Sequence, residues 1–192
     1  MSGFNLSATL NVMKLAVSPQ LCLPHLVVST FNDLPVPIPA NPTIKAIVLD
    51  KDNCFAKAHD DKVWPEYQSK WDLLRTQYPG AQLLIVSNSA GTNDDIDYKQ
   101  AQILEERTGV TVLRHTTKKP GCHVEIMSYF KKHGVCERSD EVAVVGDRLF
   151  TDILMANMMG ARGCWVRDGV SQSQSLICKI ERWWYTTFTD KK

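Results

Sequence analysis

The sequence predicts an α/β domain built on a doubly wound parallel sheet, with helices on both faces of the sheet. Apolar runs of strand length recur along the chain and alternate with segments whose apolar residues stand three or four positions apart. The runs are apolar throughout, which is typical of parallel strands that are buried on both faces. With 192 residues, the chain is long enough to form one such domain with a full core.

Five strands and four helices are expected in alternating order. Apolar runs predict strands over residues 44–50, 82–89, 109–115, 141–147 and 160–168. The spacing of apolar residues predicts helices over 65–78, 96–109, 120–134 and 151–160. The third of these helices carries a typical ending, in which Lys131 and Lys132 precede Gly134.

Composition divides the chain into three parts. The stretch "DLPVPIPANP" (33–42) contains four prolines, which hold it extended before the first predicted strand. We therefore expect residues 1–40 to form an N-terminal leader, 41–170 to form the α/β core and 171–192 to form a separate C-terminal segment.

Composition also excludes several classes of protein. The 22 Lys and Arg residues are matched by 21 Asp and Glu residues, so there is no general basic field for binding nucleic acid. Six scattered cysteines form no C-x-x-C pair and no cluster at zinc spacing, which favours free thiols in a reducing compartment. No stretch approaches the roughly 20 apolar residues of a transmembrane helix.

Polar residues close several of the predicted strands, at the sheet edge where doubly wound domains place their sites. In chain order they are Asp50 and Asp52, then Ser87 and Asn88, then Lys118 and Lys119, then Asp147 and Asp152. This combination suits phosphoryl transfer. A carboxylate can attack phosphorus and carry the phosphoryl group, a Mg²⁺ ion held by carboxylates offsets the repulsion, and hydroxyl and ammonium groups hold the transferring oxygens.

The order of these motifs resembles the haloacid-dehalogenase-like hydrolases, which have a Rossmann-like sheet. Their pattern is D-x-D after the first strand, Ser or Thr after the second, a Lys, and paired acids. The resemblance implies that Asp50 is the nucleophile and Asp52 the general acid and base. It implies that Ser87, with Asn88 beside it, binds the phosphoryl group. The lysine of the pattern is Lys119, directly before a proline, with Lys118 as the alternative that also contacts substrate.

The resemblance also implies a magnesium site. Its ligands would be the Asp50 carboxylate, the backbone carbonyl of Asp52 and the Asp147 carboxylate, while Asp152 would be a further ligand or would orient water and the lysine. An Asp at position 52, where P-type pumps have Thr, favours hydrolysis because it supplies a proton shuttle. Asn53 stands where the superfamily often has Gly; since Asn tolerates positive φ, we expect the turn to be retained.

No separate cap domain is expected. The intervals from Asp52 to Ser87 and from Ser87 to Lys119 are each filled by one helix and its connections. An uncapped site suits a phosphate carried on something large, such as a lipid headgroup, a protein or a bulky sugar.

Four segments resemble one branch, the phosphatidylglycerophosphatases of fungal mitochondria and their bacterial relatives. They are "LDKDNC", "SNSAG", "TTKKPGC" and "VVGDRLFTDILMAN", within roughly residues 40–168. The resemblance implies hydrolysis of phosphatidylglycerophosphate to phosphatidylglycerol, towards cardiolipin, at the matrix face of the mitochondrial inner membrane. Motif spacing by itself predicts only a Mg²⁺-dependent phosphatase.

Two apolar segments are candidates for contact with the membrane surface. Residues 4–31 contain few charges, and residues 176–188 set tryptophans beside basic side chains, which suits the headgroup level. The alternative for both is that they cover the core. Arg148 either contacts an anionic headgroup or pairs with an acid.

Two other functions compete with this interpretation. One keeps the fold and changes the substrate to a sugar phosphate or a phosphoprotein. The other is a receiver-like signalling domain that accepts a phosphoryl group on Asp at a later strand. The receiver is disfavoured because the D-x-D comes first and the strand ending at Ser87 supplies no Asp.

Overall fold

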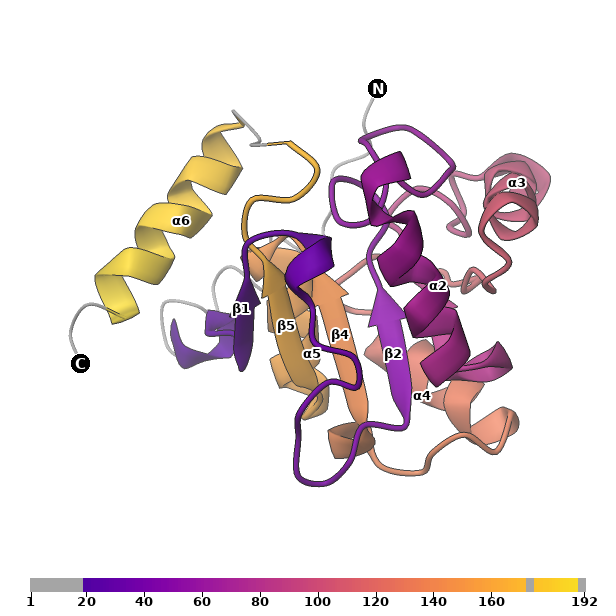
Figure 1. Cartoon of the computed structure of the whole chain (residues 1–192), viewed down its shortest axis with the longest axis horizontal. Coiled ribbons are helices and arrows are strands. Elements are labelled where there is room, and N and C mark those ends of the chain that lie inside the picture. Colours follow the sequence, from indigo (N-terminus) through magenta and orange to yellow (C-terminus); the bar gives the residue numbers. More distant parts are fainter. Residues whose placement is uncertain (1–18, 172–174, 190–192) are drawn as a thin grey trace.

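A five-stranded parallel sheet forms the centre of the molecule in a computed structural model that describes residues 19–171 and 175–189 (Figure 1). The strand order is β1-β5-β4-β2-β3. The strands are β1 Leu26–Val28, β2 Ala46–Leu49, β3 Leu83–Ile85, β4 Val142–Gly146 and β5 Arg162–Val166. The helices are α2 Gln68–Gln77, α3 Lys99–Thr108, α4 His123–Lys132, α5 Leu154–Met159 and α6 Leu176–Thr189. The predicted doubly wound α/β class is confirmed.

The central strand β2 shows why the apolar runs become strands. Every residue of β2 is buried, and Leu49 lies in register with Ile85 on one side and Val145 on the other. Alternate side chains enter different cores: Leu49 packs in the cluster that includes Trp71 of α2, whereas Val48 packs in the cluster that includes Phe130 of α4. A strand covered on both faces needs apolar residues at every position.

The four predicted helices are present, and each is shorter than its predicted range. Three of them follow a short helical turn of another type. Short 3-10 turns, Pro65–Tyr67 and Ile96–Tyr98, lead into α2 and α3. A π-helical turn, Leu149–Ile153, leads into α5. The end of α4 at Lys132, two residues before Gly134 with its φ of 64°, confirms the predicted helix end.

One strand prediction is wrong, and one strand was not predicted. Residues 109–115 do not form a strand; Val112 makes a single bridge to Ile85, because a left-handed Gly109 (φ 67°) turns the chain just before it. The edge strand on the other side is instead β1, which pairs with β5 and lies within the predicted leader. Its three residues follow Pro24 too closely to give a recognisable strand pattern.

The described part of the leader packs with the core. Phe31, Leu34 and Ile38 are buried in the same cluster as Leu49. Residues 1–18, which carry much of the predicted membrane-interface segment, lie outside the described residues. In the described ranges no separate cap domain interrupts the fold, and none of the helices is long and apolar enough to cross a bilayer.

Candidate active site

The carboxyl ends of β2, β3 and β4 open into one cavity of about 520 Å³. Asp50 and Asp52 reach it from the end of β2, Asn88 from the loop after β3, and Asp147 and Arg148 from the loop after β4. These segments meet because the three strands are neighbours and parallel, so their carboxyl ends share one edge of the sheet. The acids therefore lie at the carboxyl edge of the sheet, where the sequence predicted the site.

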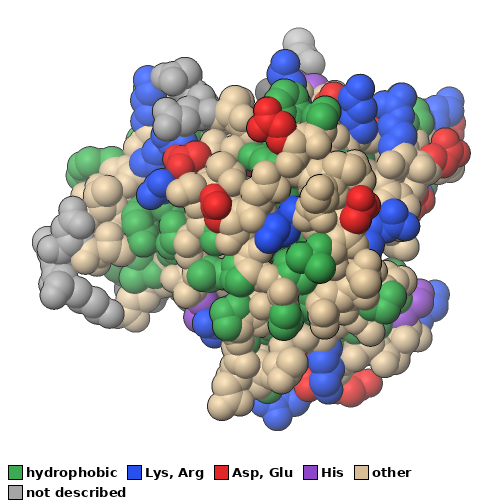
Figure 2. All heavy atoms as spheres, in the orientation of Figure 1, with side chains coloured by type: hydrophobic (Ala, Val, Ile, Leu, Met, Phe, Trp, Pro, Cys, Tyr) green, Lys and Arg blue, Asp and Glu red, His purple; other side chains and the backbone are tan. Residues whose placement is uncertain are grey.

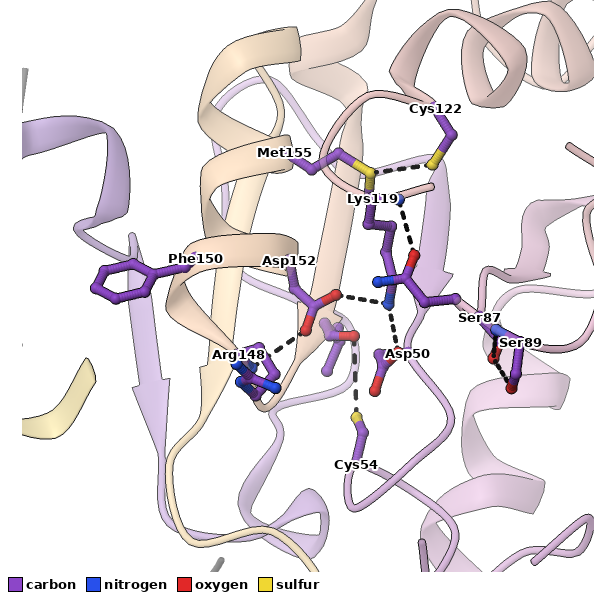
Figure 3. Close-up of polar contacts among 12 residues, drawn as sticks. Asp50, Cys54, Ser87, Ser89, Lys119, Cys122, Arg148, Phe150, Asp152 and Met155 are labelled. Atoms are coloured by element: carbon purple, nitrogen blue, oxygen red, sulfur yellow. Dashed lines mark hydrogen bonds and ion pairs between the residues drawn. The ribbon is translucent and has the colours of Figure 1, made fainter. Parts of the chain in front are cut away.

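Lys119 lies at the floor of this cavity, between two carboxylates (Figure 3). Its Nζ donates to Asp50 Oδ1 and, at 2.7 Å, to Asp152 Oδ1. Its backbone N–H donates to Asn88 Oδ1 at 2.8 Å, which ties the lysine loop to the loop after β3. The side chain is 3 % exposed. Of the two candidate lysines, Lys119 therefore enters the site.

Lys118 points elsewhere. Its Nζ pairs with Asp94, and it does not line the cavity. The backbone turns at Lys119 and Pro120, and of the two adjacent lysines only Lys119 contacts the acids. The structure therefore does not bring Lys118, predicted as a substrate contact, together with the other site residues.

Buried carboxylates outnumber buried ammonium groups at the site. Asp50, Asp147 and Asp152 each offer a carboxylate oxygen, and these oxygens lie within 4.8 Å of one another. Burial raises the pKa of Asp50 to about 7 against the opposing effect of Lys119. Burial, with Asp50 next, raises the pKa of Asp147 well above its usual value. Burial lowers the pKa of Lys119, but Asp152 and Asp50 outweigh it and raise that pKa overall, so the ammonium stays charged.

Asp152 is positioned by a close approach to the backbone. It follows the end of β4 in the π-helical turn, and its Oδ2 accepts the backbone N–H of Arg148 at 3.1 Å. The carboxylate lies directly against Gly146: a Cβ added there would stand 2.4 Å from the Asp152 carboxylate. Only glycine at this position leaves room for the acid.

Gly146→Ala is therefore expected to lower phosphatase activity by about 10²-fold, since a displacement near 1 Å at a catalytic group has an effect of that size. Steady-state kinetics with any hydrolysed ester would measure it. Gly134→Ala is the control: nothing lies within 4 Å of its added Cβ, and only its φ of 64° opposes the change. It should cost about 1–2 kcal/mol of stability and no activity. Equal kinetics for both variants would contradict this account of Gly146.

Asp52 lines the cavity, and hydrogen bonds restrain one of its two carboxylate oxygens. Its Oδ1 accepts from Lys51 Nζ and from the backbone N–H of His59, both at 2.8 Å. Lys51 is buried and also donates to the carbonyl of Asp60 at 2.8 Å. Sequence reasoning missed Lys51, although a lysine between two strand-end acids was a visible signal.

Asn53 does more than permit the turn. Its φ of 61° confirms the expectation that Asn supports the left-handed conformation there. Its Nδ2 also donates to Asp147 Oδ2 at 3.0 Å, and its Oδ1 accepts the backbone N–H of Ser171 at 3.0 Å. The amide thus joins the loops after β2 and β4 to the segment beyond β5.

The predicted phosphoryl ligand Ser87 is buried and does not line the cavity. Its Oγ lies 3.0 Å from Ser89 Oγ (Figure 3). Ser89 and Asn88 line the cavity. The carbonyl of Ser87 lies 3.0 Å from Nε2 of the buried His115. Ser89 is a polar group at this edge that the sequence interpretation did not name.

Arg148 pairs with an acid, which is one of the two interpretations offered for it. It lines the cavity, and its Nε donates to Glu181 Oε2 at 2.9 Å. Glu181, on α6, is 1 % exposed and also accepts the backbone N–H of Phe150 at 2.9 Å. Burial raises the pKa of Glu181 despite the guanidinium beside it. No local signal marked Glu181, because its partner is far away in sequence.

The parallel sheet, with acids and a lysine gathered at its carboxyl edge, is consistent with the haloacid-dehalogenase-like class of hydrolases. Comparison with known proteins is more specific. Residues 6–171 match the family described as mitochondrial PGP phosphatase. The chain belongs to this family.

Individual relatives agree. The chain is 58% identical to the mitochondrial phosphatidylglycerophosphatase GEP4 of Saccharomyces cerevisiae, over 93% of this chain and 95% of that protein. It is 29% identical to a probable mitochondrial phosphatidylglycerophosphatase of Schizosaccharomyces pombe, over 88% of this chain and 85% of that protein. It is also 34% identical to phosphatidylglycerophosphate phosphatase 1, chloroplastic/mitochondrial, of Arabidopsis thaliana, over 73% of this chain and 39% of that protein.

Proposed function

We propose that this chain is a Mg²⁺-dependent phosphatase that hydrolyses phosphatidylglycerophosphate to phosphatidylglycerol and inorganic phosphate. The observation that carries the chemistry is the buried contact of Lys119 with both Asp50 and Asp152 at the floor of an open cavity. The names of the relatives support the choice of a lipid substrate. The predicted step towards cardiolipin follows from that choice.

The residues present fit a hard divalent cation. Three carboxylate oxygens lie within 4.8 Å of one another, and one lysine ammonium pairs with two of these groups. The remaining two negative charges would be balanced by one divalent cation. Carboxylate and carbonyl oxygens are the ligands that Mg²⁺ prefers. We assign Asp50, Asp147 and the carbonyl of Asp52 as ligands, with Asp152 as a further ligand or an orienting group. When bound, the ion would neutralise charge on the transferring phosphoryl group.

Hydrolysis takes two steps in this proposal. A carboxylate oxygen of Asp50 bonds to phosphorus as the bond from phosphorus to the lipid oxygen breaks, which leaves an aspartyl-phosphate. Asp52 gives its proton to the departing lipid oxygen. Asp52 then takes a proton from water, the water oxygen bonds to phosphorus, and the bond to Asp50 breaks. One water is consumed, and both aspartates return to their starting states.

The remaining groups hold and orient. Lys119 keeps its ammonium group against the attacking carboxylate, where it faces the transferring oxygens. Asn88 and Ser89, which line the cavity, are proposed to bind the phosphoryl group, and the buried Ser87 hydroxyl, 3.0 Å from Ser89 Oγ, is proposed to support them. Lys51 and the backbone of His59 restrain one oxygen of Asp52.

A substrate carried on a large body suits the open cavity. In the described ranges no cap domain covers the mouth, so a headgroup can enter while its acyl chains remain in a bilayer. We therefore propose a peripheral enzyme acting at the matrix face of the mitochondrial inner membrane. The mitochondrial names of the fungal relatives support this location.

A substrate panel tests the proposal. Purified protein with Mg²⁺ is given phosphatidylglycerophosphate in detergent micelles, several sugar phosphates and a phosphopeptide, and phosphate release is measured. We expect kcat/KM for the lipid to exceed the others by about 10²-fold or more, because headgroup contacts lower the transition state only for the lipid. Comparable or faster hydrolysis of a sugar phosphate or phosphopeptide would favour the rival capless phosphatase. Stoichiometric labelling without turnover would favour a receiver.

Asn53→Gly provides a prediction about the metal ligands. Glycine keeps the left-handed turn but removes the amide that donates to Asp147. Partners that orient metal ligands typically contribute 10- to 100-fold in affinity, so the Mg²⁺ concentration for half-maximal activity should rise by about tenfold. Activity measured across a Mg²⁺ titration checks this. An unchanged titration midpoint would mean that the amide only supports the loop.

A further inference from the structure

The outward side of α6 carries an apolar stripe. Leu176, Ile177, Ile180 and Trp183 are 76%, 52%, 50% and 64% exposed, and their spacing places them on one side of the helix. We call these four residues the α6 stripe. The opposite side of α6 packs inward through Glu181 and through Trp184 and Tyr185, which join the cluster around Trp165. The helix is therefore apolar on the solvent side as well as on the core side.

This helix is also a wall of the proposed active site. Ser175, directly before α6, and Cys178, in its first turn, line the same cavity as Asp50. One turn further along, Glu181 holds Arg148 beside that cavity. A surface that receives the α6 stripe would consequently lie next to the cavity mouth.

A second exposed apolar side chain lies in another segment that adjoins the site. Ile96 is 76% exposed, a value that only Leu176 equals among the large hydrophobic residues of the described ranges. It follows Asp94, the partner of Lys118, in the loop beyond β3. The backbone at Asp97 and Tyr98, next to Ile96, is left-handed at φ 55°, a conformation that non-glycine residues rarely adopt.

The charge around the α6 stripe and its exposed area indicate what kind of surface binds it. Basic and hydrophobic side chains adjoin one another on the α6 side of the molecule (Figure 2). Lys179 and Arg182 belong to this helix, and the only acid on it, Glu181, is buried and paired. Four side chains at these exposures offer about 500 Å², short of the roughly 800 Å² that each partner gives to a stable protein interface. Tryptophan beside cations suits the headgroup level of an anionic bilayer.

We propose that the α6 stripe docks on the surface of an anionic lipid bilayer and thereby holds the cavity mouth at the headgroups. This inference rests on the proposed function, which makes the substrate a lipid phosphate. The helix lies along the surface and does not cross it, since its 14 residues are too few for a span.

Vesicle flotation tests the inference. Full-length protein is mixed with phosphatidylcholine vesicles that contain or lack phosphatidylglycerol, and the fraction that floats is measured. The variant Ile180→Gln/Trp183→Gln should bind the anionic vesicles about tenfold or more weakly. The control Leu73→Gln/Ile103→Gln changes side chains 47% and 39% exposed on α2 and α3 and should bind like the parent. Undiminished flotation of the α6 variant would overturn the proposal.

Two further measurements keep the result interpretable. Hydrolysis of a small soluble ester, para-nitrophenyl phosphate, should stay within about twofold in the α6 variant, because neither changed residue lines the cavity. Trp183→Phe retains an apolar side chain, so it should still float, yet it should lose quenching of protein fluorescence by brominated acyl chains. Quenching equal to that of the parent would place Trp183 away from the bilayer and reject the docking surface.

The remaining outcomes separate the two proposals. A lower molar mass of the α6 variant in light scattering would show that the stripe joins copies of this chain, which contradicts docking on lipid. Failure of the parent protein to hydrolyse phosphatidylglycerophosphate in micelles, with flotation lost only in the α6 variant, would reject the substrate and retain the surface. Hydrolysis of phosphatidylglycerophosphate in micelles, with flotation of the α6 variant unchanged, would retain the substrate and reject the docking surface.

Discussion

Replacing Asp50 with asparagine is expected to lower phosphatase turnover by about 10⁴-fold or more, because the amide cannot form the aspartyl-phosphate. Single-turnover experiments with acid quenching should show phosphorylated protein in the parent and none in the variant. Asp72→Asn, which changes an exposed acid on α2, is the matched control and should retain full activity. Substantial residual turnover of Asp50→Asn would move the nucleophile to another residue.

The same variant makes a prediction about stability. Because burial raises the pKa of Asp50 to about 7, the metal-free folded protein keeps this proton at pH values where the unfolded chain has lost it. The stability that the group contributes is fully present below about pH 4 and is lost as the pH rises through about 7. Asparagine does not ionise, so the variant loses no stability in this way as the pH rises. In EDTA, the melting temperature of Asp50→Asn should therefore rise relative to the parent between these pH values; a constant difference would contradict the raised pKa.

Removal of the divalent ion is expected to have the second large effect. With EDTA present, phosphate release should fall to background, and excess Mg²⁺ should restore it, because one lysine cannot offset three carboxylates and an incoming phosphate. Mg²⁺ at 100 times its dissociation constant adds about 2.7 kcal/mol, which should raise the melting temperature of the metal-free protein by roughly 5–10 °C.

A paired comparison assigns that effect to the site. Asp147→Asn should remove most of the thermal shift, since it removes a proposed ligand. Asp140→Asn changes an acid that pairs with Arg138 on the surface and should leave the shift unchanged. Full turnover in EDTA would exclude the metal role, and a normal shift in Asp147→Asn would place the ion elsewhere.

Much of the fold was predictable because it depends on local pattern. The uniformly apolar run before Asp50 became a strand buried on both faces, and helical spacing before Gly134 became α4. The acids and Lys119 were predictable as a group because parallel strands deliver their carboxyl ends to one edge. Each of these inferences requires only neighbours in sequence and the topology of the sheet.

The features that were missed depend on partners distant in sequence. The strand β1 forms because it pairs with the edge of β5. Three residues that follow a proline are too short a run to predict a strand. The roles of Glu181 and of the Asn53 amide depend on Arg148 and Asp147, each reached only after folding. The choice between Lys118 and Lys119 depended on which side chain faced the acids, and adjacent residues of the same type give no hint of that.

The position of Glu181 in the chain has a consequence for biosynthesis. All five strands precede it, so a nascent polypeptide leaving the ribosome can assemble the sheet before the carboxylate that pairs with Arg148 has emerged. Ser175 and Cys178 arrive equally late. Catalytic competence should consequently lag behind formation of the sheet, and a chain truncated before α6 would lack residues that line the site.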